Sequence, residues 1–366
     1  MRIDGLRLDE RASIELRALY RSYGYSPYRV GKFEEYDLYR QNRNFLESER
    51  ILTFSDTDGR LLAMRPDVTL SIVKNTLGEE GALKVCYAER VYRVPRGETG
   101  FREIVQTGVE YIGEVDAYAT GEVVMLAARS LATISERYAL DVSDMGVVAG
   151  VLAGEVLDAA ERSELLSLIS EKNPHGLSDA CERFGVSAYG RRMLSSLLSL
   201  YGPMADVLPA LEALGLPPAC DGALTSLRAL AKMVDAYGLD HIHLDFSVVN
   251  DMGYYNGVIM NGFIDGVPAC VLSGGRYDPL LRRMGRAGEA IGFAVYLDQI
   301  ERYLHKNAAF DVDVLITYDE GADPIAVARE AEKAAAEGRS VRVQRGEAGG
   351  VSFRERIHIE GGGRQQ

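Results

Sequence analysis

The sequence predicts an α+β fold: a β-sheet flanked by helices, with a helical insertion and a short α/β segment near the C-terminal end. Residues 83–113 carry aromatic and β-branched side chains between turn signals, as strands do. Residues 145–240 resemble short Leu- and Ala-rich helices separated by Gly and Pro. Residues 311–344 then follow a strand–helix–strand pattern. Since 366 residues exceed the usual size of a single core, we expect one large domain and one or two smaller ones.

The N-terminal part predicts a helix followed by strands. Residues 11–23 space their apolar side chains as a helix does, and residues 24–30 (GYSPYRV) predict a turn into a strand. Residues 61–74 and 83–113 are the next predicted strands. Residues 117–139 are predicted to form a long amphipathic helix that packs on the sheet.

The middle of the chain predicts a separate helical segment. Residues 145–240 hold 12 acidic and 7 basic residues, which suits a solvated helical segment and offers few cations to a phosphate backbone. Strands return at 241–274, where residues 263–267 (FIDGV) resemble a hairpin turn. We therefore expect a core made of residues 1–144 and 241–305, interrupted by the 145–240 insertion.

The C-terminal part predicts a small unit of its own. A helix near 297–304 ends the core, and residues 306–366 are expected to form a truncated α/β segment. The last residues, 360–366 (EGGGRQQ), are expected to be disordered.

Composition narrows the classes of function. The four cysteines are widely scattered with no CxxC pair, which argues against a zinc site or a disulfide framework and favours a reducing compartment. There is no apolar leader region and no run of about 18 apolar residues, so we expect a soluble, cytoplasmic protein without a membrane segment. A net charge of −13 weakens long-range attraction to phosphate backbones. It argues against nucleic acid as a partner, although a local basic patch stays compatible with one.

The run AMRPDVTLSIVK at residues 63–74 holds the first candidate binding residues. Asp67 and Thr69 are two positions apart, which predicts that both side chains lie on one face of an extended strand. Such a pair suits the ammonium group of a free amino acid, because charge-assisted hydrogen bonds are strong. An ordinary strand edge after a turn is the alternative interpretation of this run.

A histidine pair is the only metal-like spacing that we find. His241 and His243 alternate on one predicted strand face beside Asp245. No further ligand is evident, so we expect an ordinary histidine pair and no metal site.

Three ordered motifs resemble those of the histidyl-tRNA synthetase family of class II synthetases, over about residues 1–304. Residues 85–113 resemble that family's motif 2, and residues 252–257 (MGYYNG) resemble its histidine-binding tyrosine pair. Residues 272–300 resemble its last strand, helix and motif 3. Any one motif alone is a weak signal, but their order and spacing together are specific. The resemblance implies a class II aminoacyl-tRNA synthetase-like core in which a six-stranded antiparallel sheet carries the site.

Carried over by position, the resemblance implies a pocket for histidine. The implied residues are Asp67, Thr69, Gln106, Glu110, Tyr254 and Tyr255. The first three would surround the α-amino group. Glu110 and Tyr255 would hold the imidazole, with Tyr254 beside them. A carboxylate and a phenol supply the acceptor and donor that the two ring nitrogens need. The alternative is that Glu110 and the two tyrosines are ordinary strand residues.

The same comparison implies that residues for ATP chemistry are missing. Residues 250–253 (NDMG) stand where the family has Arg-Gly-Leu-Asp, so a cation that faces the α-phosphate is absent. Gln299 stands for the Arg that ends motif 3, and Pro95 for the glutamate that meets adenine. Arg93 and Arg102 of motif 2 are kept and stay available to an anionic ligand. We therefore expect a histidine receptor without aminoacylation activity.

This combination resembles the regulatory-subunit family of ATP phosphoribosyltransferase. About 55 residues follow Phe310, too few to complete a synthetase's anticodon-binding domain. The resemblance implies a subunit without catalytic activity that is required for the first step of histidine biosynthesis. Its partner would be the short-form catalytic subunit, in a hetero-octamer within which this chain forms a dimer. Histidine would be the allosteric feedback effector, with no cofactor. Gly31 stands where motif 1, which forms the dimer interface, has Pro.

Two other functions stay open at this point. One is an active histidine–tRNA ligase of reduced form. The other is a synthetase-like enzyme that adenylates another substrate, such as a protein lysine. Histidine-dependent ATP–pyrophosphate exchange distinguishes the ligase from a regulatory subunit, whereas the other adenylating enzyme would still need the missing cations.

Overall fold

The computed structural model describes residues 6–43, 46, 50–76, 81–94, 99–249, 254–304, 310–347 and 349–361. It divides into two compact units, Met1–Leu304 and His305–Gln366. Each unit is described by itself.

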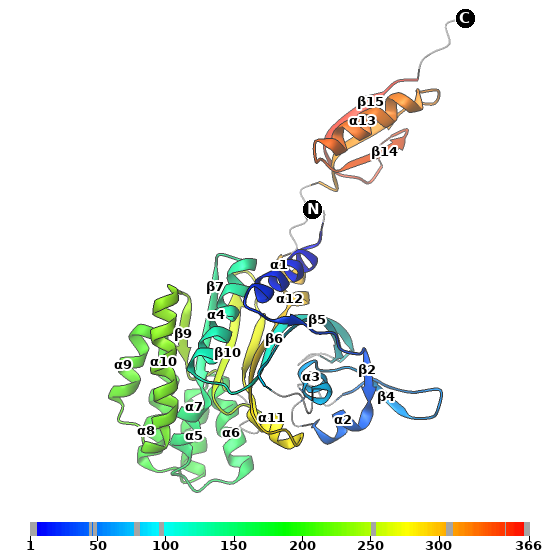
Figure 1. The fold of residues 1–366 in the computed structure, drawn as a ribbon. Coiled ribbons are helices and arrows are strands. Elements are labelled where there is room, and N and C mark those ends of the chain that lie inside the picture. The colour runs from blue at the N-terminus through cyan, green and yellow to red at the C-terminus, as the bar shows by residue number, and fades with distance from the viewer. Residues whose placement is uncertain are drawn as a thin grey trace, which may run out of the picture. The chain divides into compact units, whose positions relative to one another are not determined.

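A nine-stranded sheet forms the centre of the first unit (Figure 1). Its strands lie in the order β1-β5-β6-β12-β11-β10-β7-β9-β8. All neighbours from β5 to β7 pair antiparallel, which confirms the expected six-stranded antiparallel sheet. Outside these six, β1 and β9 pair parallel with β5 and β7, and β8 pairs antiparallel with β9. The strands are β1 (Ser26–Pro27), β5 (Leu83–Arg93), β6 (Arg102–Gly113), β7 (Tyr138–Asp144), β8 (Tyr201–Pro203), β9 (Ile242–Asp245), β10 (Val258–Ile264), β11 (Leu272–Arg276) and β12 (Glu289–Tyr296).

Helices cover both faces of this sheet. On one face α1 and α4 share a continuous apolar core with the helices α5 to α10. On the other face α3 and α11 pack over a second core, and this face carries the candidate site. The helices are α1 (Leu8–Ser22), α2 (Tyr36–Gln41), α3 (Thr69–Asn75), α4 (Ala117–Ile134), α5 (Met145–Leu152), α6 (Ala159–Ser170), α7 (Pro174–Arg183), α8 (Ala188–Ser199), α9 (Met204–Ala213), the 3₁₀ helix η2 (Pro218–Cys220), α10 (Asp221–Tyr237), α11 (Asp278–Arg283) and α12 (Leu297–Leu304).

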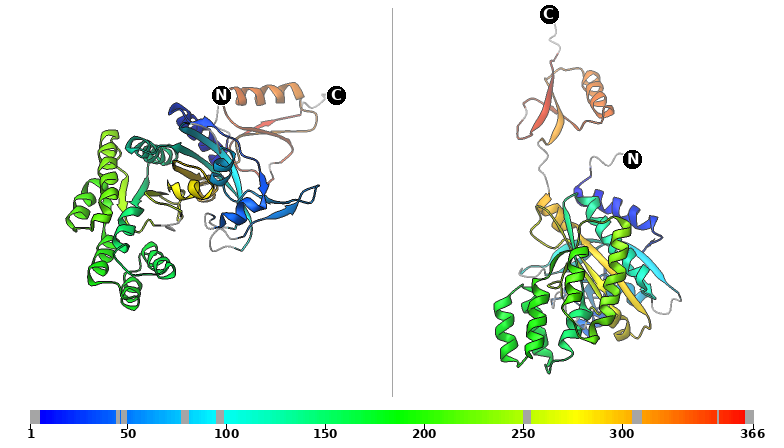
Figure 2. Two further views of the ribbon diagram at one scale, coloured as in Figure 1. Left: turned by 60° about the horizontal axis from the view of Figure 1, so that its bottom comes forward. Right: turned by 90° about the vertical axis from the view of Figure 1, so that its left-hand side faces the viewer.

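Helices α5 to α10 gather at one end of the large sheet (Figure 2). The helical character predicted for residues 145–240 is confirmed, apart from the short strand β8. These helices share their core with α4 and the sheet, so the division into a core and an insertion at residues 145 and 240 stays a prediction.

A small sheet lies at the other end, with the order β2-β4-β3. Its strands are β2 (Phe33–Glu35), β4 (Leu61–Met64) and β3 (Thr53–Ser55). Arg65 follows β4 and is 1% exposed. Its guanidinium donates to the carbonyls of Val30 and Gly31 (2.8 and 2.6 Å) and forms an ion pair with Glu89 (2.8 Å). The turn that contains Gly31 is therefore held by a buried cation.

The predicted extended strand through Asp67 and Thr69 is wrong. Strand β4 ends at Met64, and Thr69 is the first residue of α3. The carboxylate of Asp67 accepts a hydrogen bond from the backbone N–H of Leu70 (2.8 Å), as a residue at a helix start does. This local bond to an otherwise unsatisfied N–H favours a helix over a strand.

The predicted helix 117–139 is too long. Asp116 caps α4 at its start by accepting from the N–H of Ala119 (2.8 Å), but the helix ends at Ile134 and β7 begins at Tyr138. Tyr138 pairs with Ile264 of β10. This long-range pairing overrides the local helical pattern, which explains why β7 was missed.

Three further elements of the first unit agree with the prediction. The strand pair around residues 263–267 is confirmed, since β10 and β11 pair antiparallel and Gly266 has a φ of +84° in the turn. The helices expected at 11–23 and 297–304 are α1 and α12.

The second unit is a three-stranded parallel sheet with one helix. Strands β13 (Val312–Tyr318) and β14 (Val341–Arg345) flank α13 (Pro324–Ala336), as the strand–helix–strand pattern predicts. A third strand, β15 (Phe353–Ile359), pairs parallel with β13 and was not predicted. Of the tail expected to be disordered, residues 362–366 lie outside the described residues.

Candidate functional site

A pocket on the α3 side of the large sheet brings together seven of the eight predicted site residues. They come from four places: the β4–α3 connection, the end of β5, the middle of β6 and the segment before β10. The seven are Asp67, Thr69, Arg93, Gln106, Glu110, Tyr254 and Tyr255. The eighth, Arg102, is exposed at the start of β6 and pairs across the sheet with Arg93.

Glu110 lies at the centre of the pocket and is 2% exposed. Its Oε1 accepts a hydrogen bond from the hydroxyl of Thr69 (2.7 Å), and its Oε2 accepts one from the hydroxyl of Tyr277 (2.6 Å). The carboxyl group is therefore held at both oxygens and cannot swing out of the pocket without breaking a buried bond.

Burial raises the pKa of Glu110 from 4.5 to about 8. The hydrogen bonds from Thr69 and Tyr277 lower it, and the nearby charge of Asp67 raises it further. The group is therefore mostly protonated at neutral pH. A cationic group of a ligand placed against Glu110 favours the ionised carboxylate. Binding such a group therefore removes the proton from this carboxyl group.

Glycines on the central strands make room for this carboxylate and for the tyrosine rings. Gly292 of β12 pairs with Glu110, and a Cβ there would lie 1.9 Å from Glu110 Oε2. A Cβ on Gly275 of β11 would lie 2.8 Å from the ring of Tyr255. Gly108 and Gly274 likewise have no room for a Cβ. A Cβ on Gly108 would lie 2.1 Å from a backbone carbonyl oxygen, and a Cβ on Gly274 would lie 2.2 Å from another. Of these four glycines, Gly274 and Gly292 line the pocket directly, so its floor contains positions that tolerate no side chain.

Three tyrosines in the lining of the pocket lie close to one another. Tyr254 and Tyr255 meet edge to face with ring centroids 4.4 Å apart, and Tyr277 lies 6.4 Å from Tyr254. Tyr277 is 2% exposed and was not among the predicted residues, although it lies within residues 272–300, which resemble the last strand, helix and motif 3 of the synthetase family. Its role depends on a contact 167 residues away in the sequence, which spacing alone does not show.

The outer part of the pocket carries the motif 2 cation. Arg93 is 6% exposed, and its guanidinium lies 5.8 Å from the ring centre of Tyr296. The hydroxyl of Tyr296 shares a 2.5 Å hydrogen bond with that of Ser273. Sequence reasoning also missed these two hydroxyls, which line the pocket beside Arg93.

The ATP side differs from the synthetase pattern in the described residues too. Asp298 and Gln299 begin α12 where motif 3 ends. Burial raises the pKa of Asp298, while the charges of Arg93 and Arg102 lower it. A carboxyl group thus lies within the field of both motif 2 arginines and offsets part of their charge. Pro95 and residues 250–253 lie outside the described residues.

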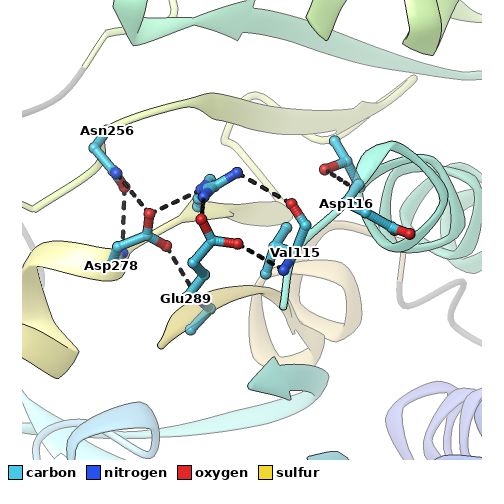
Figure 3. A network of polar contacts seen from close by, with 8 residues as sticks. Val115, Asp116, Asn256, Asp278 and Glu289 are labelled. Atoms are coloured by element: carbon cyan, nitrogen blue, oxygen red, sulfur yellow. Dashed lines mark hydrogen bonds and ion pairs between the residues drawn. The ribbon is translucent and has the colours of Figure 1, made fainter. Parts of the chain in front are cut away.

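A polar network holds the residues next to two of the pocket tyrosines (Figure 3). It joins Asn256, Asp278, Arg276, Glu289 and Val115. Asn256 donates to Asp278 Oδ2 (2.8 Å) and accepts from the N–H of Asp278 (3.2 Å), and Arg276 donates to the same carboxylate (2.9 Å). Asn256 follows Tyr255 and Arg276 precedes Tyr277, so the network fixes the backbone that carries both tyrosines.

The predicted histidine pair lies at the start of β9. The Nδ1 atom of His243 lies 3.3 Å from Asp141 Oδ1, and no group of three or more metal-type side chains occurs among the described residues. Within the same described ranges, no helix is long and apolar enough to cross a membrane.

Comparison with known proteins gives the family. A family model described as histidyl-tRNA synthetase matches residues 6–300. A relative from Alkaliphilus metalliredigens, named ATP phosphoribosyltransferase regulatory subunit, is 30% identical over 77% of this chain and 73% of its own length. The chain belongs to this histidyl-tRNA synthetase-like family of ATP phosphoribosyltransferase regulatory subunits. A family member of the same name from Clostridium kluyveri is also 30% identical, over 83% of this chain and 81% of its own.

Solved structures agree on the fold of this regulatory-subunit family. An ATP phosphoribosyltransferase regulatory subunit/histidyl-tRNA synthetase from Bacillus halodurans superposes with a TM-score of 0.76 at 24% identity, over 97% of this chain and 95% of its own. A chain of the ATP phosphoribosyl transferase (HisG:HisZ) complex from Thermotoga maritima superposes with a TM-score of 0.62 at 17% identity. The match covers 80% of this chain and 98% of that chain. The predicted class II synthetase-like fold and the resemblance inferred from the three motifs are therefore confirmed.

Proposed function

We propose that this chain is a regulatory subunit of ATP phosphoribosyltransferase that binds free histidine in the Glu110 pocket and has no catalytic activity of its own. The observation that carries the proposal is the pair of hydroxyl contacts on Glu110, which aim one buried carboxyl group into a pocket also lined by Asp67 and Gln106. A carboxyl group so held accepts the N–H of an imidazole, and the carboxylate of Asp67 suits an ammonium group.

The absence of synthetase activity is inferred from the ATP side of the pocket. Gln299 carries no charge where motif 3 supplies a cation, and Asp298 opposes the charges of Arg93 and Arg102. A triphosphate needs fixed positive charge, so this arrangement disfavours adenylate formation. The two arginines stay candidates for a weaker anionic ligand, such as the carboxylate of histidine or a phosphate.

The proposed partner follows from the names of the relatives. We place the chain in the cytoplasm, as a dimer within a hetero-octamer with the short-form catalytic subunit and without a cofactor. Histidine bound here would act as feedback effector in the first step of histidine biosynthesis. Its coupling to the catalytic subunit is expected to lie near the usual 1–3 kcal/mol for allosteric effectors.

Calorimetric titration of the purified full chain tests the pocket. Histidine should bind with one site per chain, while histamine and imidazole-4-propionate, which lack the carboxylate and the amine, should bind more weakly. Absence of histidine binding by both the chain and its complex refutes the proposal. Histidine-dependent ATP–pyrophosphate exchange at synthetase rates would instead show an active ligase.

Reconstitution with the short catalytic subunit tests the regulatory role. The mixed complex should form phosphoribosyl-ATP, and the chain alone should not. If histidine inhibits through this chain, a complex that contains Glu110→Gln should need at least tenfold more histidine for half-inhibition. Equal sensitivity of both complexes would place the inhibitory site on the catalytic subunit.

A further inference from the structure

A second cavity lies where the helices after β7 meet the large sheet. It has a volume of about 310 Å³ and is separate from the Glu110 pocket, with which it shares no lining residue. The beginning of α10 forms one side through Gly222, Ala223 and Ser226. Asp144, at the end of β7, and Asn256 and Arg276 form the opposite side. A space of this size holds a small metabolite.

Small residues keep this cavity open. Nothing lies within 4 Å of a Cβ placed on Gly222, so a side chain there would enter free space at the rim. Gly146 lies across from it, and its Cβ would meet that of Ala223 at 3.0 Å. A longer side chain at position 222 therefore meets no obstacle at its Cβ, at the edge of the cavity that Gly222 lines, and leaves the helix undisturbed.

The charges around the cavity favour a cation. Asp144 is 3% exposed, and one of its oxygens accepts from the N–H of Gly146 (2.8 Å). Burial raises the pKa of Asp144, while the N–H of Gly146, the hydroxyl of Ser226 and the charge of Arg276 lower it, so the ionised form gains further from another positive group. Among the described residues of the lining, Arg276 is the one cation, and it is paired with two carboxylates, Asp278 and Glu289. The two carboxylates outweigh the single positive charge of this guanidinium. An anionic ligand in the cavity would therefore meet net negative charge.

The same backbone segments line both the cavity and the Glu110 pocket. Tyr254 and Tyr255 line the pocket, and the next residue, Asn256, lines the cavity. Arg276 lines the cavity, and the next residue, Tyr277, lines the pocket and bonds to Glu110. A ligand that draws on Asn256 or Arg276 therefore acts on backbone that positions the tyrosines.

We propose that this cavity is a second ligand site, which binds a small organic ammonium ion against Asp144 and is coupled to the Glu110 pocket through Asn256 and Arg276. The ammonium donates to the Asp144 carboxylate, and the hydroxyl of Ser226 and the side chain of Thr120 give further polar partners. The proposed coupling between the two sites rests on the proposed histidine site. The proposed binding of an ammonium ion in the cavity does not.

Three probes of equal length and different charge test the site on the full chain. They are 1,4-diaminobutane, butane-1,4-diol and succinate, titrated while backbone amide resonances around Gly146 and Gly222 are followed by NMR. Saturable binding of the diamine, at least tenfold tighter than that of the diol and with no binding of succinate, is the expected result. Equal shifts with all three probes, or tighter binding of the diol or succinate, overturn the assignment.

Two variants test the location. Asp144→Asn keeps the cap on α5, because Asn caps helices as well as Asp does, but should weaken diamine binding at least tenfold. Gly222→Leu should abolish diamine binding by filling the cavity, and it replaces a poor helix former. Glu110→Gln should leave diamine binding unchanged. Binding that survives both cavity variants, or that Glu110→Gln removes, contradicts the proposal.

Histidine titration at saturating diamine tests the coupling. The apparent Kd for histidine should change about fivefold or more, with the reciprocal change in diamine affinity, as linkage requires. An unchanged Kd refutes the coupling while the cavity site stands on the NMR result. A chain that binds the diamine but no histidine refutes the proposed function alone.

Discussion

Replacing Glu110 by Gln should weaken histidine binding by about 1.5–3 kcal/mol, which is roughly 10- to 150-fold in Kd. In the native chain the hydroxyls of Thr69 and Tyr277 donate to the two carboxyl oxygens of Glu110. The variant keeps the size of the side chain and one of these acceptor oxygens. It removes the group that can become a carboxylate. The loss therefore measures a hydrogen bond to a charged partner and not the loss of packing.

The pH dependence of this effect follows from two pKa values. Free imidazole titrates near about 6.5, and Glu110 near about 8. Between these values the free ligand is neutral and Glu110 is protonated, so an imidazolium–carboxylate pair forms without net proton exchange and affinity is level. Above the pKa of Glu110 a proton must be taken up, and Kd should rise about tenfold per pH unit. In Glu110→Gln that rise is absent, so the ratio of the two Kd values shrinks as pH rises.

Isothermal titration at several pH values measures the ratio of the Kd of the variant to that of the parent chain. Titration of the ligand's α-amino group affects both Kd values equally, so it does not change the ratio. Glu103→Gln is the matched control, because Glu103 lies on the same strand but is exposed and pairs with Arg90. It should bind histidine as the parent chain does. A ratio near one at neutral pH would remove Glu110 from the binding site. A ratio that stays constant well above the pKa of Glu110 would refute the proton-sharing pair.

Three further outcomes follow from the described contacts. The raised pKa of Glu110 means that the folded chain holds one more proton than the unfolded chain from pH 4.5 to about 8; thermal stability should therefore fall as pH rises through this window, by up to about 1.4 kcal/mol per unit, and the slope should be smaller in Glu110→Gln. Gly292→Ala places a methyl carbon 1.9 Å from Glu110 Oε2 and 2.5 Å from the backbone carbonyl oxygen of Val109, so it should lower histidine affinity by more than tenfold, as titration will show. Arg65→Met leaves buried carbonyls and Glu89 without their cation and should destabilise the chain by about 3–5 kcal/mol in thermal melts, whereas Arg60→Met, an exposed control, should cost less than about 1 kcal/mol.

The sequence allowed the order of the large elements and most of the pocket to be predicted, because both depend on signals that lie close together. Gln106 and Glu110 are four residues apart on one strand, and Tyr254 and Tyr255 are neighbours, so each pair reaches the pocket together. Tyr277 was missed because its partner Glu110 is 167 residues away.

The errors have local causes. Period-two spacing put Asp67 and Thr69 on a strand, but the Asp67 carboxylate bonds to the N–H of Leu70 and starts a helix instead. Strand β7 was missed because its first residue, Tyr138, continues the helical pattern of α4, and only pairing with β10 decides its conformation. β15 alternates weakly, with only Phe353, Ile357 and Ile359 partly covered, and most of its side chains are exposed.

The glycine floor of the pocket has a consequence for how its ligand preference can change. Gly108, Gly274, Gly275 and Gly292 sit against atoms that leave no room for even a methyl group. A replacement at any of these four positions adds bulk in or beside the pocket, where the surrounding atoms leave no space, so it disrupts the sheet or closes the pocket before it alters selectivity. New preferences can therefore arise only from the other side chains that line the pocket, such as Asp67, Gln106 and Arg93, while the glycine positions stay fixed for as long as the sheet keeps this strand order.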